Sequence, residues 1–115
     1  MLIKSSDRET KTRSAMRDGP GSVLIKDICS KEELYEKNRL FAQMTLKKGC
    51  GIGYHEHSGE KEIFLINSGK AIYNDDGNEI VVNVGDVLIC EDGHGHAITN
   101  ISEEDCEFTA LIVLN

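Results

Sequence analysis

The segment GYHEHSGEKEIFLINSG, residues 53–69, holds two of the chain's four histidines one residue apart, followed by an apolar run typical of a β-strand. Alternate side chains of a strand point to the same face, so we expect His55 and His57 to face together and Glu56 to face the other way. Two imidazoles placed in this way can bind one metal ion, although two surface histidines give the same short pattern. Glu62 follows a short loop, and its carboxylate could complete the same face.

Short apolar runs separated by turn residues continue on both sides of this segment. Residues 39–46 alternate apolar and polar side chains, which indicates a half-buried strand. The turn at 68–69 predicts a hairpin, and residues 30–38 predict a helical turn because Ser30 and Glu33 have the spacing of a capping box. Further strands are expected at residues 21–28, 62–67, 70–74, 79–84, 85–90, 96–101 and 107–115. Such a series of short strands predicts an all-β sandwich or barrel.

The first 20 residues are polar, mixed in charge and without a regular period. We expect them to form a mobile or loosely docked N-terminal arm, followed by a single domain at residues 21–115. The arm carries five Lys or Arg and three acidic residues, which leaves eight basic and seventeen acidic residues for the domain. A surface this acidic repels phosphate backbones, which argues against nucleic acid as a partner.

The cysteine pattern and the N-terminal sequence predict a cytoplasmic protein. No CxxC pair occurs, and no apolar stretch could serve as a signal peptide or membrane span. We therefore expect no membrane partner and reduced, structural thiols at all four cysteines. These are Cys29, Cys50, Cys90 and Cys106.

Two glycine-containing motifs frame the histidines. The first has the form G-x5-HxH-x4-E-x6-G, and its members are Gly49, His55, His57, Glu62 and Gly69. The second has the form G-x7-G-x2-H-x3-N, and its members are Gly85, Gly93, His96 and Asn100. In these motifs the sequence resembles the cupin superfamily, with residues 70–84 in the place of its intermotif segment. Glu91 stands where the second motif of this family usually has Pro.

The resemblance implies a small antiparallel jelly-roll barrel of the cupin type, also called a double-stranded β-helix, and a homodimer. It further implies that His55, His57, Glu62 and His96 bind one divalent metal ion per chain. We expect Glu91 in place of Pro to make the loop before His96 looser, without removing a metal ligand. The types of donor atom support a metal site independently of the resemblance. Three neutral imidazoles and a carboxylate suit Mn, Fe, Co, Ni, Zn or Cu and leave one or two coordination positions open.

The neighbours of this set have less specific roles. His94 lies between two glycines, so we expect it at the rim of the pocket, with a proton-transfer role as the alternative. We expect Glu56 and Glu60 to be solvated surface residues. Phe64 and Ile66 lie two and four residues after Glu62, so on a regular strand they point to the same face as Glu62. This position is compatible with lining of the cavity and with plain core packing.

Function within this superfamily is open, because one barrel hosts enzymes as well as binding domains. After Pro20 the chain has a single arginine, Arg39, which favours a small apolar or neutral organic ligand over a phosphorylated one. We expect a metal-binding protein that acts on a small organic molecule, with metal-dependent dioxygenation as the leading enzyme class. A non-catalytic metal-containing binding or sensor protein and a metal-dependent isomerase are the alternatives.

Overall fold

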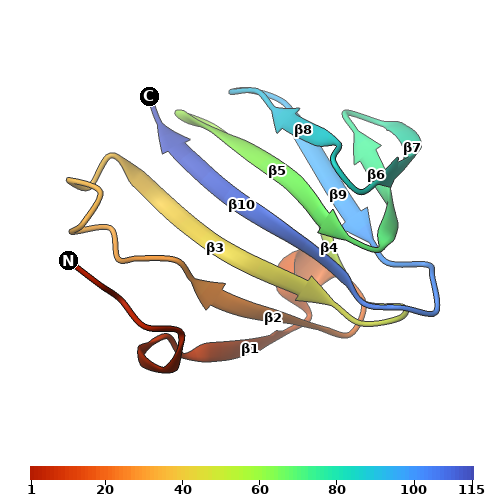
Figure 1. Ribbon diagram of the computed structural model, residues 1–115. Coiled ribbons are helices and arrows are strands. Elements are labelled where there is room, and N and C mark those ends of the chain that lie inside the picture. The colour runs from red at the N-terminus through yellow and green to blue at the C-terminus, as the bar shows by residue number, and fades with distance from the viewer.

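Two antiparallel β-sheets form the fold of the computed structural model, which describes residues 1–115 (Figure 1). The larger sheet has six strands in the order β1-β2-β3-β10-β5-β8, and the smaller sheet has four in the order β4-β9-β6-β7. The strands are β1 (Thr10–Ser14), β2 (Ser22–Asp27), β3 (Asn38–Leu46), β4 (Gly51–Glu56), β5 (Glu60–Ser68), β6 (Lys70–Asp75), β7 (Asn78–Asn83), β8 (Val87–Cys90), β9 (Gly95–Thr99) and β10 (Cys106–Leu114). The predicted all-β antiparallel jelly roll is confirmed.

The helical content is limited to two short 3-10 helices, η1 (Ser5–Asp7) and η2 (Met16–Asp18). Neither has the length and apolar character that a membrane span needs.

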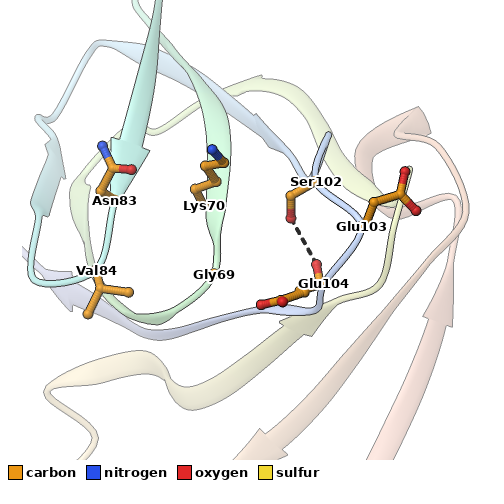
Figure 2. Close-up of a pocket in the computed structure, with 7 residues that line it drawn as sticks. All are labelled: Gly69, Lys70, Asn83, Val84, Ser102, Glu103 and Glu104. Carbon is orange, nitrogen blue, oxygen red and sulfur yellow. Dashed lines mark hydrogen bonds between the residues drawn. The ribbon is translucent and has the colours of Figure 1, made fainter.

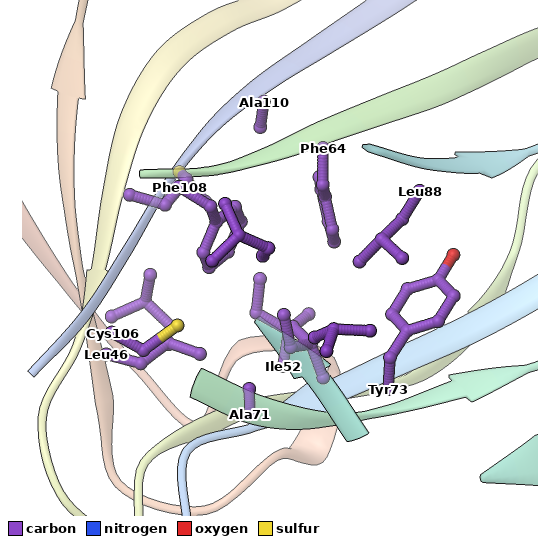
Figure 3. Packing of buried hydrophobic residues seen from close by; sticks show 14 of the residues in the cluster. Leu46, Ile52, Phe64, Ala71, Tyr73, Leu88, Cys106, Phe108 and Ala110 are labelled. Atoms are coloured by element: carbon purple, nitrogen blue, oxygen red, sulfur yellow. The ribbon is translucent and has the colours of Figure 1, made fainter. Parts of the chain in front are cut away.

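The core lies between the facing sides of the two sheets (Figure 3). Its fifteen buried residues include the aromatic side chains of Phe64, Tyr73 and Phe108. On β3, Ala42, Met44 and Leu46 are buried while Gln43 and Thr45 between them are half-buried, so the alternation predicted for this strand is confirmed. Burial of one large apolar side chain contributes about 1.5–3 kcal/mol. The barrel therefore has a source of stability that is separate from the histidine cluster.

Two β-bulges redirect side chains that matter for the site. In β3 the register with β10 shifts so that Arg39 has no paired residue. In β4 the register with β9 shifts between Ile52 and His55, where Gly53 and Tyr54 lie. A bulge inserts an extra residue and turns the side chains that follow it to the other face of the strand. His55 can therefore face the interior even though buried Ile52, three positions earlier, also does so.

The turn at residues 68–69 joins the two sheets, so the hairpin predicted there is wrong. β5 pairs with β10 and β8, whereas β6 pairs with β7 and β9. Gly69 has φ of 74°, and a Cβ atom there would collide with the backbone of Asp105 and Cys106. The observed hairpin is β6-β7, whose turn residues Asp76 and Gly77 both have positive φ, as a type I′ turn requires.

Residues 31–36 form hydrogen-bonded turns in place of the predicted helical turn. The Glu33 N–H donates a long hydrogen bond of 3.5 Å to the Ser30 hydroxyl, so part of the capping box forms. Tyr35 and Glu36 both have φ of 55°, in the left-handed region, where a right-handed helix cannot continue.

The N-terminal segment lies more closely against the barrel than we expected. β1 extends the larger sheet by pairing with β2 along its whole length. η2, drawn in orange behind the larger sheet in Figure 1, contacts β4, and the Gly51 N–H donates to the Pro20 carbonyl oxygen over 2.8 Å. All five residues of β1 are exposed, so this strand has no hydrophobic period that could have predicted it. The domain boundary at residue 20 stays a prediction.

All four cysteines are free thiols, as predicted. Cys90 and Cys106 are buried, and burial raises the pKa of each thiol to about 11. Because the thiolate is the reactive form, these two residues act as small packing groups.

Candidate metal centre

Four side chains from three strands meet inside the barrel. His55 on β4 lies opposite His96 on β9, Glu62 comes from β5, and His57 follows directly after β4. His55 is half-buried, and the other three are buried. Their ligand atoms all lie within 4.8 Å of one another. The structure thus brings together all four residues that the two motifs single out.

The spacing of these atoms fits a single transition-metal ion. Glu62 Oε1 lies 2.9 Å from His96 Nε2 and 3.2 Å from His57 Nε2. The two nitrogens are 3.1 Å apart, and His55 Nε2 lies 3.9 Å from the same carboxylate oxygen. Ligands at right angles around an ion with bonds of about 2.1 Å are themselves ~3 Å apart. Since the donors are three imidazole nitrogens and one carboxylate, these residues can hold such an ion.

Each imidazole has a second partner that fixes the direction of its ring. His55 Nδ1 lies 2.8 Å from the Gly53 carbonyl oxygen, and His96 Nδ1 lies 2.8 Å from the Tyr73 hydroxyl. His57 Nδ1 contacts the Glu60 carboxylate. With each Nδ1 engaged in this way, the Nε2 lone pairs are directed toward the shared centre, which is how ligating histidines are usually oriented.

The protonation states of the cluster suit a cation. Burial by itself would raise the pKa of Glu62, but hydrogen bonds with His55, His57 and His96 outweigh it and hold the pKa well below its usual range. Burial lowers the pKa of His96, which favours the neutral imidazole. The hydrogen bond with Glu62 raises the pKa of His57, so a metal ion would displace a proton from this ring.

A cavity of about 240 Å³ opens onto the cluster, with His55, His57 and Glu62 in its wall. Three arginines also line it: Arg13, Arg17 and Arg39. The apolar part of the wall is formed by Met16, Ile25, Leu40, Met44, Ile52 and Ile112. This wall favours an anionic ligand over the apolar or neutral one that we expected, because the N-terminal segment adds cationic groups that a count of arginines beyond Pro20 omitted.

A comparison with known protein families matches the Cupin domain to residues 42–113. This chain belongs to the cupin family. The cupin is 39% identical over 114 residues to an oxalate-binding protein of Thermotoga maritima, a match that covers 99% of this chain and 94% of that protein. It is 38% identical to a predicted oxalate decarboxylase of the same organism, whose crystal structure matches with a TM-score of 0.95 over 100% of both chains.

More distant structures share the fold alone. KdgF from a Halomonas species is 9% identical, with a TM-score of 0.76 over 100% of this chain and 94% of that one. A cupin protein of Bacteroides fragilis is 21% identical, with a TM-score of 0.67 over 99% of this chain and 81% of that one.

Glu60 is tied into the site, so the prediction that it is a solvated surface residue is wrong. Its side chain is 12% exposed, and it bridges His57 and Arg39. Arg39 binds both carboxylate oxygens, at 3.0 and 2.8 Å, and this bond chiefly lowers the pKa of Glu60 to about 2. The bulge in β3 explains the contact, because regular alternation would point Arg39 away from the interior.

Glu56 is exposed, as the strand parity predicted. His94 is also exposed, and its Nδ1 lies 2.9 Å from Asp76, outside the cavity wall. The loop with Glu91 in place of Pro is held by an ion pair of 3.0 Å between Glu91 and Lys61, and His96 remains buried beyond it. The substitution therefore leaves the ligand in place.

Phe64 and Ile66 belong to the hydrophobic core and do not line the cavity. Of the two alternatives for these residues, core packing is the correct one. Phe64 still supports the site, because its ring stacks on that of His96 with centroids 5.1 Å apart.

A second, larger hollow of about 580 Å³ lies elsewhere on the molecule (Figure 2). Its lining residues are Gly69, Lys70, Asn83, Val84, Ser102, Glu103 and Glu104. It shares no residue with the histidine cluster, and Glu103 is already paired with Lys48 at 2.7 Å. We therefore assign the site to the smaller cavity.

Sequence reasoning missed four residues of the site, which are Arg39, Glu60 and, in the first 20 positions, Arg13 and Arg17. The excess of basic residues in the first 20 positions was the available signal for the two arginines. The signal for Glu60 was weaker, namely its position three residues after His57 in a short loop.

Proposed function

We propose that this cupin binds one divalent transition metal ion through His55, His57, Glu62 and His96 and captures oxalate, or a closely similar small dicarboxylate, beside it. The observation that carries the proposal is the meeting of a fitting ligand set with an arginine-lined cavity. The likeness to an oxalate-binding protein supports it. When bound, the ion would offer open coordination positions to carboxylate oxygens.

The cavity wall favours capture of the ligand over its conversion. Decarboxylation of oxalate to formate delivers a proton to carbon, which calls for a general acid within reach of the ligand. Apart from arginines, the titratable side chains of the wall are His55, His57 and Glu62, all assigned to the metal. Arginine stays protonated at neutral pH and is a poor proton donor. Dioxygenation and isomerisation stay predictions that no feature of this wall favours.

Calorimetric titration with oxalate tests this proposal, on protein loaded with Mn²⁺ and on protein stripped by a chelator. We expect one oxalate to bind per loaded chain, and binding to be about a hundredfold weaker without metal, which corresponds to about 2.8 kcal/mol. Mass spectrometry and an oxygen electrode should find the oxalate intact and no oxygen consumed. Formate release would show a decarboxylase in place of a binding protein, and the absence of binding to loaded protein would contradict the proposal itself.

The homodimer stays a prediction, for which the outer face of the larger sheet offers a surface. Leu65 on β5 lies opposite Val87 on β8, and they are 40% and 58% exposed. Ile89, the next outward residue of β8, is 48% exposed. Apolar faces of this kind are typical of homodimer interfaces.

Light scattering should give twice the 12.7 kDa mass of one chain. The double change of Leu65 and Ile89 to Lys should shift the protein to single chains, because it places charges on an apolar contact. A mass of 12.7 kDa for the unmodified protein at all concentrations would exclude the dimer.

A further inference from the structure

The three arginines of the cavity differ in what their charges do. Arg39 is neutralised by its two contacts with the Glu60 carboxylate. Arg13 and Arg17 form neither an ion pair nor a side-chain hydrogen bond, although the basic residues Lys11 and Arg39 do pair. Two unpaired guanidinium groups therefore line a site in a protein whose net charge is −7.

The fold holds these two arginines at the cavity by separate contacts. Arg13 lies on β1, opposite buried Val23 of β2, and so shares the inner side of the larger sheet. Arg17 belongs to η2, which packs on the bulge of β4. A Cβ atom at Gly53 would collide with the Arg17 carbonyl oxygen, and one at Gly19 would collide with Gly53. The absence of side chains at both glycines permits this close approach.

The loop around Arg17 also has an unfavourable backbone. Ala15, Arg17 and Asp18 have φ of 50°, 52° and 61°, in the left-handed region of backbone conformation that residues other than glycine rarely adopt. Residues in such conformations persist where the surrounding structure imposes them, and they occur preferentially at ligand sites. Here the surrounding contacts are those with β4, directly before the His55 ligand.

We infer that Arg13 and Arg17 bind the carboxylate groups of the ligand, and that residues 10–19 thereby make the site selective for small dianions over monocarboxylates. The inference rests on the proposed function. A divalent ion beside the ionised Glu62 leaves one net positive charge, which a monocarboxylate already neutralises. The second carboxylate of a dianion needs a further cation, and a guanidinium group donates two parallel hydrogen bonds to it.

Calorimetry on Mn²⁺-loaded protein, with oxalate and formate as ligands, tests the role of each arginine. In Arg13→Met and Arg17→Met, Met keeps an aliphatic stem and removes the charge. We expect each change to weaken oxalate binding about tenfold and the double change to weaken it about a hundredfold. Formate binding should weaken by less than about threefold, and elemental analysis should still find one metal ion per chain.

Lys11→Met is the matched control, since Lys11 also lies on β1 but pairs with Asp27 at 3.7 Å and lies outside the cavity. It should leave oxalate affinity unchanged. Wild-type affinity in both arginine variants, or an equal loss in the lysine variant, would overturn the inference while leaving the proposed function intact. If the wild-type protein binds no oxalate, the proposed function and this inference are both wrong.

Discussion

Changing His57 to Ala is expected to lower metal affinity by more than about a hundredfold, because the ring supplies one of four ligand atoms and a fixed Nε2 direction. His57 Nε2 lies within 3.2 Å of both Glu62 Oε1 and His96 Nε2, so its loss removes a donor that lies beside two of the other three. Elemental analysis of protein purified without added metal or chelator should find one ion per wild-type chain and almost none in the variant. The variant should keep its far-UV circular dichroism, since the fifteen-residue core does not include His57.

His94→Ala is the matched control for this experiment. His94 is exposed and lies two residues before a ligand, yet its side chain contacts Asp76 and no member of the cluster. Its removal should leave the metal content unchanged. Stoichiometric metal in the His57 variant, or equal losses in the two variants, would contradict the assignment of the site.

Changing Glu60 to Gln is expected to lower metal affinity by about ten- to a hundredfold, the usual effect of losing the partner that orients a ligating histidine. Glutamine keeps the shape of the side chain but loses the charge that pairs with Arg39 and holds the Nδ1 proton of His57. Competition with a chelating dye would measure the dissociation constant of the metal. Oxalate affinity per metal-loaded chain should change much less, because Glu60 is not in the cavity wall.

Glu56→Gln provides the comparison, because it removes the same charge from an exposed neighbour on β4. Its metal affinity should equal that of the wild type. Equal affinities in both glutamine variants would show that the bridge from Arg39 to His57 is only a surface ion pair, which contributes little.

Strand periodicity identified much of the site because it is a local property of one strand. His55 and His57 face together, Glu62 is buried between exposed Lys61 and half-buried Ile63, and Glu56 faces solvent, as alternation predicts. The resemblance of the second motif to the cupin family then added His96, which no local pattern connects to the other three. The alternation of β3 was equally visible, since it depends on side-chain parity along one strand.

The contacts of a strand with its neighbours had no such local signal. The chain at residues 68–69 crosses between sheets because β5 finds partners in β10 and β8, far away in the sequence. The bulge that turns Arg39 inward depends on its register with β10. Glu60 is drawn from solvent because it contacts both that arginine and His57.

The sequence by itself therefore determined the fold class and the four candidate ligands, because strand parity relates His55 to His57 and the resemblance of the two motifs to the cupin family adds Glu62 and His96. Only the tertiary structure decided the charge of the cavity. Arg13 and Arg17 come from a polar segment without any period, and they reach the site because β1 pairs with β2 and because two glycines let η2 approach β4. Backbone pairing and close packing of this kind depend on the partner strand, so the pattern of side chains in residues 10–19 does not predict them.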